Sequence, residues 1–125
     1  MEIIDIIKQD YQNFPDRQTY SVYAENVYFE DPLNKFNGVE KYQKMIEFLG
    51  TFFKNVNLEL HSIEQQERTI ITVWTLNMTS PLPWKPRLSI PGWSELQLDE
   101  RDTIVAHCDR WKIAPWKVLL QNFSS

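Results

Sequence analysis

The sequence has 125 residues, of which 42% are hydrophobic and 24% are charged, as is typical of one globular domain. The formal net charge is −4, and the lysine and arginine residues form no run, which argues against nucleic acid as the main partner. The aromatic share of 14% is high and fits either a bulky core or an apolar pocket.

Nothing in the chain indicates secretion or membrane insertion. Cys108 is the single cysteine, so no internal disulfide is expected, and this is typical of a reducing compartment. The acidic start of the chain does not resemble a signal peptide, and no apolar run reaches the length of a membrane span. We therefore expect one domain over residues 1–125 that is soluble and cytoplasmic.

The N-terminal part predicts two helices followed by a short strand. Apolar residues recur at helical spacing before Pro15, at Ile3, Ile4, Ile7, Tyr11 and Phe14. Tyr11 therefore lies on the buried face of the first helix, where its hydroxyl needs a partner. A second, shorter helix is expected from Asp16 to about Ala24, closed by Asn26, and a strand from Val27 to Glu30.

The segment Phe29-Glu30-Asp31-Pro32 ends this strand. Pro32 keeps its predecessor out of helical dihedrals, so the carboxylate of Asp31 is fixed between a strand and the third helix. Asn37 is the expected N-cap of that helix, with Glu40 three residues later. The helix has a broad apolar face made by Val39, Tyr42, Met45, Ile46, Leu49, Phe52 and Phe53.

From Asn57 onward the apolar period changes from that of a helix to that of a strand. Residues 69–79 are apolar on both faces, which indicates a central strand. Residues 80–92 contain four prolines and are expected to form a long connection. Two more strands are expected at 93–98 and 103–112, and a short helix from Pro115. The order predicts an α+β chain whose helices cover one face of a curved sheet.

The last predicted strand carries an unusual set of polar side chains. Strand alternation places Val105, His107, Asp109 and Trp111 on one face, and Ile104, Ala106, Cys108 and Arg110 on the other. Two interpretations of the first face remain open. His107 and Asp109 either hydrogen-bond their neighbours on a wet face or line a cavity with a polar floor.

The sequence gives little support for other catalytic or binding motifs. An aspartate before proline often starts a turn, so turn formation and catalysis both remain open for Asp31. His61 and His107 lie on separate predicted strands without zinc-ligand spacing, so no metal is expected. The chain has three glycines and no phosphate-binding loop, and Cys108 is interpreted as a packing thiol; we expect no cofactor.

Three stretches carry a family resemblance: residues 23–32, ending in Glu30-Asp31-Pro32, then Phe36-Asn37-Gly38 before a long helix, and the ending 104–111. Together with the strand around Trp74 they resemble the SnoaL-like branch of the nuclear-transport-factor-2-like superfamily. The set is most similar to an uncharacterised family of cyanobacteria and plants. The resemblance implies a cone: a strongly curved, mixed and mostly antiparallel sheet wrapped around the N-terminal helices, with a pocket opening near the first strand.

The resemblance also implies roles for single residues. Ketosteroid isomerases of this superfamily carry a similar Glu-Asp-Pro whose aspartate shuttles a proton beside a carbonyl, and Asp31 falls on that base. Tyr11 falls near their oxyanion-binding tyrosine. Ser94 falls where they carry a protonated acid, and a hydroxyl is a weaker donor than that acid. His107 and Asp109 resemble the polar pair on the last strand of SnoaL-like proteins.

The function expected from this pattern is binding of a small, largely apolar molecule, with proton transfer of the isomerase or hydratase kind. In this hypothesis Asp31 is the base, Tyr11 the oxyanion donor, and His107, oriented by Asp109, returns the proton. Ser94 and a set of rings form the ligand wall: Phe29, Tyr42, Trp74, Trp93 and Trp111. A non-catalytic ligand carrier and a protein-interaction module are the alternatives. We also expect a homodimer, because residues 69–79 and 116–123 carry apolar faces.

Overall fold

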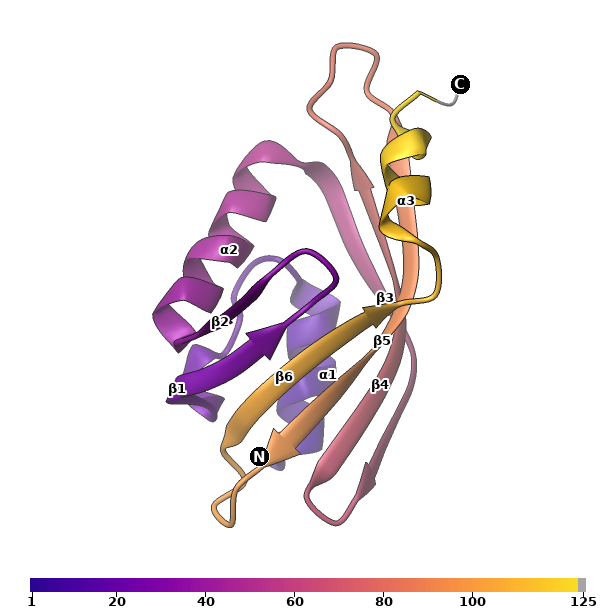
Figure 1. Ribbon diagram of the computed structural model, residues 1–125. Coiled ribbons are helices and arrows are strands. Elements are labelled where there is room, and N and C mark those ends of the chain that lie inside the picture. Colours follow the sequence, from indigo (N-terminus) through magenta and orange to yellow (C-terminus); the bar gives the residue numbers. More distant parts are fainter. Residues whose placement is uncertain (124–125) are drawn as a thin grey trace.

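The computed structural model describes residues 1–123 and combines helices with one curved sheet (Figure 1). The helices are α1 (Ile3–Asn13), α2 (Val39–Phe52) and α3 (Pro115–Gln121), with a short 3-10 turn at Tyr20–Val22. The strands are β1 (Tyr23–Glu30), β2 (Lys35–Asn37), β3 (Lys54–Gln66), β4 (Thr69–Thr79), β5 (Arg87–Leu98) and β6 (Ile104–Trp111).

The six strands form one sheet in the order β2-β1-β6-β5-β4-β3. Neighbouring strands are antiparallel except β1 and β6, which are parallel. Figure 1 shows α1 and α2 on the same side of the bent sheet, so the sheet curves around the two helices. The predicted α+β cone with a mixed, mostly antiparallel sheet is confirmed.

Three groups of buried residues form the core. One joins Ile3 and Ile7 of α1 to buried residues of β1, β4, β5 and β6. A second surrounds Trp74 and includes Val118 of α3. The third joins Phe29 of β1 to α2 through Tyr42 and Ile46. The groups surround a space that they do not fill, and the polar residues discussed below face it.

The second predicted helix is wrong. Its residues form only the 3-10 turn, and β1 already begins at Tyr23, so Ala24 and Asn26 belong to a strand. Tyr23 pairs with Ile104 of β6, and its ring lies 5.1 Å from that of Tyr42. These contacts are distant in sequence, and they outweigh the weak local preference for a helix.

The predicted N-cap of α2 is also wrong. Asn37 lies at the end of β2, and its side-chain amide donates to the carbonyl of Asn26. Gly38 occupies the N-cap position with a φ of 118°, a conformation that a residue with a Cβ rarely adopts. The strand pair therefore continues up to the first residue of the helix. At the other end of α2, Phe52 is exposed and Phe53 lies beyond the helix.

The expected connection 80–92 is shorter than predicted, because β5 begins at Arg87 and contains Pro91 and Gly92. The carbonyl of Pro91 accepts from the amide of Lys112, just past the last residue of β6. A strand residue points its N–H and C=O to the same side, so the missing N–H of Pro91 lies where β6 has ended. Pro91 and Lys112 therefore share only one hydrogen bond, and the pairing of β5 with β6 ends there.

The alternation predicted for β6 holds only from Ala106 onward. Gln97 pairs with Ala106 whereas Leu98 pairs with Ile104, which leaves Val105 as an extra residue in a bulge. Ile104 is consequently buried and lines the same space as His107, while Val105 is exposed. The prediction that Val105 shares the face of His107 is wrong for this reason.

Candidate functional site

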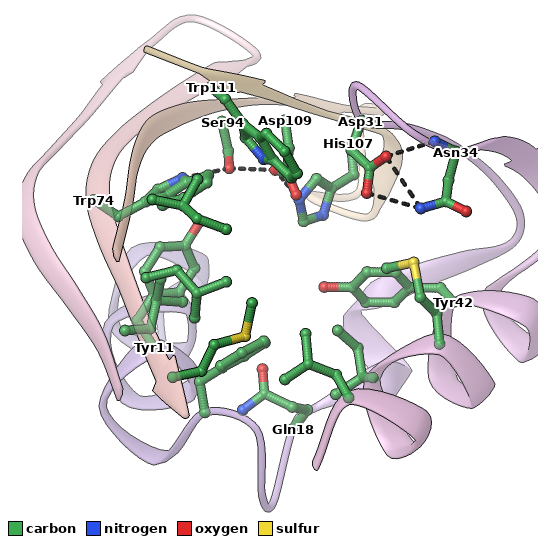
Figure 2. A pocket seen from close by; sticks show the side chains of 18 of the residues that line it. Tyr11, Gln18, Asp31, Asn34, Tyr42, Trp74, Ser94, His107, Asp109 and Trp111 are labelled. Atoms are coloured by element: carbon green, nitrogen blue, oxygen red, sulfur yellow. Dashed lines mark hydrogen bonds and ion pairs between the residues drawn. The ribbon is translucent and has the colours of Figure 1, made fainter. Parts of the chain in front are cut away.

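A cavity of about 390 Å³ lies between the concave face of the sheet and the helices α1, α2 and α3. Figure 2 looks into it. Most of its wall is apolar and is contributed by Ile46, Leu49, Trp74, Met78, Leu88 and Ile90. Small-molecule pockets in proteins typically have about 300–1,000 Å³ and a mainly apolar wall with a few polar groups. The cavity fits this description.

The predicted wall residues divide into two groups. Four of them line the cavity: Tyr42, Trp74, Ser94 and Trp111. Phe29 does not line it, because it is buried behind the rings of Tyr42 and His107, whose centroids lie 5.2 Å from its own. Trp93 lies on the other face of the sheet, in a shallow outer groove beside Glu30 and Arg110.

Polar side chains from three neighbouring strands meet on one side of the cavity. The indole nitrogen of Trp74 on β4 donates to the hydroxyl of Ser94 on β5, at 2.8 Å. That hydroxyl donates to Oδ1 of Asp109 on β6, at 2.5 Å. Nε2 of His107 lies 2.7 Å from the same oxygen. Figure 2 shows this hydrogen-bonded row along the cavity wall.

His107 connects the row to the helices. It is 5% exposed, and its Nδ1 lies 3.2 Å from the hydroxyl of Tyr23. When Nε2 donates to Asp109 in the neutral ring, Nδ1 is the acceptor and the Tyr23 hydroxyl donates to it. The imidazole packs against the ring of Tyr42, with centroids 5.4 Å apart. The orientation of the ring is therefore fixed from both sides.

Asp109 keeps one oxygen available to a ligand. Both of its hydrogen bonds end on Oδ1, and no donor among residues 1–123 reaches Oδ2. Its side chain is 21% exposed and lines the cavity. The structure thus favours the cavity interpretation of the polar face of β6 over that of a wet outer surface.

Three tyrosine hydroxyls face the inside of the cone. Burial raises the pKa of Tyr11, Tyr23 and Tyr42 well above the usual range, so all three stay protonated at neutral pH. The hydroxyl of Tyr11 forms the predicted hydrogen bond on the buried side, at 2.7 Å from Oγ1 of Thr72. In Figure 2 the hydroxyl of Tyr42 points into the open space.

Asp31 lies at the edge of the cavity, and its carboxylate forms hydrogen bonds within its own turn. Its carboxylate accepts hydrogen bonds from the backbone amides of Leu33 and Asn34 and from the side-chain amide of Asn34. This is the turn-forming role that the sequence left open. Figure 2 shows Asp31 turned toward Asn34, on the same wall as His107.

Three polar residues at the cavity were not predicted. Tyr23 was assigned to a helix, and its place in a strand follows only from pairing with β6. Gln18 lines the cavity and donates to the carbonyl of Asp10. The carboxylate of Asp10 is buried and accepts from the amide and hydroxyl of Thr19, and burial raises its pKa despite these hydrogen bonds. The signal for Asp10 is its helical spacing, because it follows Ile7 by three residues and so lies on the apolar side of α1.

Within residues 1–123 no cluster of three metal-binding side chains occurs. Across the same residues no helix is long and apolar enough to cross a membrane. The polar groups of the cavity are those of acid–base chemistry: a carboxylate, an imidazole and protonated phenols.

Solved structures with the same fold are numerous. A hypothetical protein from Catenulispora acidiphila, with a ketosteroid isomerase-like fold and in complex with trimethylamine, has a TM-score of 0.78 and 12% identity, covering 99% of this chain and 94% of that one. A SnoaL-like polyketide cyclase by description, from Jannaschia sp. CCS1, has a TM-score of 0.77 and 8% identity, covering 94% and 89%. An LEH-like epoxide hydrolase of M. tuberculosis has a TM-score of 0.72 and 10% identity, covering 94% and 84%.

At these identities the likeness shows the fold, which is that of nuclear-transport-factor-2-like and SnoaL-like proteins. Among curated proteins none matches the sequence. Residues 1–107 match a family model described as Uncharacterized conserved protein (DUF2358). The narrower link to cyanobacteria and plants stays a prediction.

Proposed function

The chain belongs to the DUF2358 family, and we propose that it binds a small, largely apolar carbonyl compound and transfers a proton next to the carbonyl. One observation carries this proposal. In a cavity whose wall is otherwise mainly apolar, Asp109 presents an oxygen without a protein donor beside the buried imidazole of His107. The likeness to epoxide hydrolase, cyclase and isomerase-like structures is consistent with a ligand-binding or catalytic use of the fold.

The apolar wall supplies the binding energy. Burying apolar surface contributes roughly 25 cal/mol per Å², and the wall offers aliphatic side chains together with the rings of Trp74 and Trp111. The volume of about 390 Å³ lies at the small end of the usual range for ligand pockets. The proposed ligand class is therefore a compact cyclic compound rather than an extended chain.

Asp109 is the proposed proton acceptor. Its Oδ2 takes the proton from the carbon next to the carbonyl; the C–H electron pair forms the carbon–carbon double bond, and the carbonyl π electrons move onto oxygen. Ser94 and His107 hold Oδ1 and so fix the direction in which Oδ2 points. If the proton on Asp109 exchanges with solvent before a proton returns to the same carbon, the result is hydrogen exchange; return to a conjugated carbon gives isomerisation.

The developing oxyanion needs a donor that stays protonated. The hydroxyl of Tyr42 fits, because burial holds its pKa high and it points into the cavity (Figure 2). Tyr11, the donor expected from the resemblance, already shares a hydrogen bond with Thr72. Its hydroxyl donates to the ligand when Thr72 supplies the proton of that bond, so Tyr11 is the second donor in the proposal.

Asp31 takes a different place in this proposal than in the hypothesis from the sequence. Its oxygens hold the turn between β1 and β2, which forms part of the rim of the cavity. We assign it to the shape of the entrance and assign the proton transfer to Asp109. The two carboxylates are distinguished by parallel substitutions, Asp31→Asn and Asp109→Asn.

A non-catalytic carrier is the second candidate. It is favoured by one observation: Tyr11, Ser94, His107 and Asp109 all have hydrogen-bond partners within the protein. A ligand without polar groups would then bind without breaking these hydrogen bonds. The carrier binds apolar molecules irrespective of a carbonyl or hydroxyl, and it leaves their C–H bonds unchanged.

Paired ligands test the binding step. Naphthalene and naphthol have nearly the same apolar surface, and only naphthol carries a hydroxyl that the polar wall recognises. Quenching of the tryptophan fluorescence by each ligand gives its Kd. The proposal predicts that naphthol binds about tenfold more tightly, the size expected of one well-formed hydrogen bond. Tyr42→Phe reduces this preference, whereas Tyr20→Phe, a tyrosine outside the cavity wall, retains it. Equal affinities in the wild type favour the carrier.

A further inference from the structure

Most of the exposed large apolar side chains in residues 1–123 lie at one end of the molecule, around the cavity mouth. Four belong to the C-terminal helix and its end: Trp116, Leu119, Leu120 and Phe123. In Figure 1 α3, the loop between β4 and β5, and the C-terminal end of α2 lie toward the same end. We call the set the apolar rim and define it as Phe48, Phe52, Trp84, Trp116, Leu119, Leu120 and Phe123.

Some members of the rim contact one another, either between segments or within one helix. The indole nitrogen of Trp84 donates to the carbonyl of Asn122, and its ring lies 6.1 Å from that of Phe123. On α2 the rings of Phe48 and Phe52 are 4.6 Å apart. The opposite side of α3 packs on the core, where Val118 is buried. The rim is thus a second apolar surface of the same elements, and it faces solvent.

The segments that carry the rim are mainly basic, although the exposed Glu47 lies next to Phe48 on α2. Segments 48–58, 79–94 and 111–123 contain no aspartate or glutamate, although the whole chain has a net charge of −4. They carry five basic residues: Lys54, Lys85, Arg87, Lys112 and Lys117. At the opposite end of the sheet, the turn 99–102 between β5 and β6 has three acidic residues and one arginine. The molecule is therefore electrically polarised along the sheet.

We propose that the apolar rim docks on the surface of an anionic lipid bilayer. Trp, Phe and Leu side chains with interspersed lysines are the composition that inserts at a membrane interface. Both tryptophans of the rim are followed directly by a lysine, and Nζ of Lys117 lies 5.6 Å from the centroid of the Trp116 ring. Lysines near an anionic surface add attraction that the apolar residues alone do not provide.

A second copy of the chain fits this surface less well. A twofold contact places the same patch against itself, so the lysines of the two copies would meet. Like charges across an interface oppose association. An anionic surface is complementary to the same lysines, so the charge pattern decides between the two occupants.

Docking would place the cavity entrance against the lipid. Phe48 and Leu119 are exposed on the rim and also line the cavity. An apolar ligand could then pass between bilayer and cavity without crossing water, an extension that rests on the proposed function. The docking itself does not depend on that function, because it concerns the outer surface alone.

Cosedimentation with vesicles tests the docking. The full chain is mixed with vesicles of phosphatidylcholine alone or of phosphatidylcholine with phosphatidylserine, and the bound fraction is measured at low and high salt. The expected result is binding to the anionic vesicles, weak binding to the neutral ones, and loss of binding with salt because the Debye length shortens. The double variant Lys85→Glu/Lys117→Glu should bind about tenfold or more weakly. The matched control Arg68→Glu/Arg101→Glu, at the opposite end, should bind like the wild type.

The apolar contribution has its own pair of variants. Trp116→Ser/Leu120→Ser removes two exposed rim residues that do not line the cavity, and vesicle binding should fall by a similar factor. Val105→Ser, on the exposed bulge of β6, is the control and should change nothing. Far-ultraviolet circular dichroism checks that each variant is folded.

Two results would overturn the proposal: no binding of the wild type to anionic vesicles at low salt, or equal losses in the rim variants and their controls. Self-association that Trp116→Ser/Leu120→Ser abolishes, without vesicle binding, would assign the rim to a second copy instead. Naphthol binding in solution is measured without vesicles. A failure of the docking is therefore distinguishable from a failure of the proposed function.

Discussion

Nε2 of His107 lies 2.7 Å from Oδ1 of Asp109, and both residues come from the same face of β6. The same oxygen accepts from Ser94 on β5, which in turn accepts from Trp74 on β4. Three adjacent strands are thereby tied together by side chains at the wall of the cavity. The same hydrogen bonds hold the cavity wall and connect the strands, so a substitution that removes one of them is expected to lower the stability of the fold as well as to change the site.

Ser94→Ala tests that coupling. The substitution leaves the buried indole N–H of Trp74 without an acceptor and removes one hydrogen bond to Oδ1 of Asp109. An unsatisfied buried donor costs about 1–3 kcal/mol, so the free energy of unfolding should fall by that amount in urea titrations. Ser89→Ala on the same strand is the control, because Ser89 is exposed and only its backbone is hydrogen-bonded. Equal stability of the two variants would contradict the role given to the row.

Gly92→Ala should disturb the same wall. A Cβ at this position would lie 2.4 Å from the carbonyl oxygen of Arg110 and 2.7 Å from the ring of Trp74. The carbonyl belongs to the paired strand β6, so the backbone cannot move aside without loss of pairing. We expect about 1–3 kcal/mol of destabilisation, the usual cost of overpacking, together with weaker naphthol binding. A variant with unchanged unfolding and binding would show that the two strands separate more easily than the structure indicates.

The buried tyrosines predict a loss of stability at alkaline pH. The pKa of Tyr11, Tyr23 and Tyr42 is raised in the folded state, mainly by burial, above the ordinary value of 10.0. The unfolded chain therefore releases these protons first as the pH rises. Their contribution is fully present below about pH 10 and is lost above it, at about 1.4 kcal/mol per pH unit for each tyrosine.

Urea unfolding between about pH 8 and pH 11 measures this dependence. Tyr42→Phe removes one of the three ionisations, so its stability should decline less steeply above pH 10 than that of the wild type. Identical slopes for the two proteins would mean that Tyr42 ionises as readily when folded as when unfolded.

Patterns of period and spacing predicted most of the fold. The limits of β4 match the predicted strand 69–79, because that strand is long and apolar and neighbouring turns mark its ends. The errors concern features set by distant contacts. β1 begins at Tyr23 because of its pairing with β6, and Pro91 is tolerated in β5 because β6 ends beside it.

The site was predictable only in part. Alternation along β6 indicated that His107 and Asp109 share a face, and both line the cavity. The bulge at Val105 could not be predicted, because it adds one residue without a sequence signal. The polar residues of other elements, such as Thr72 and Tyr23, join the site through the three-dimensional arrangement of the strands. The motif around Asp31 resembles a catalytic motif in sequence and forms a turn in the structure.

Exchange of the protons next to the carbonyl of tetralone, a compact bicyclic ketone, tests the central claim most directly. The ketone is incubated with the protein in deuterium oxide, and mass spectrometry follows the gain of deuterium. We predict that the wild type accelerates exchange, that Asp109→Asn lowers the acceleration by about 10²-fold or more, and that Asp31→Asn retains it. Binding of tetralone is measured for every variant, so that lost affinity is separated from lost chemistry. Bound tetralone without accelerated exchange in the wild type, or full exchange in Asp109→Asn, would contradict the account.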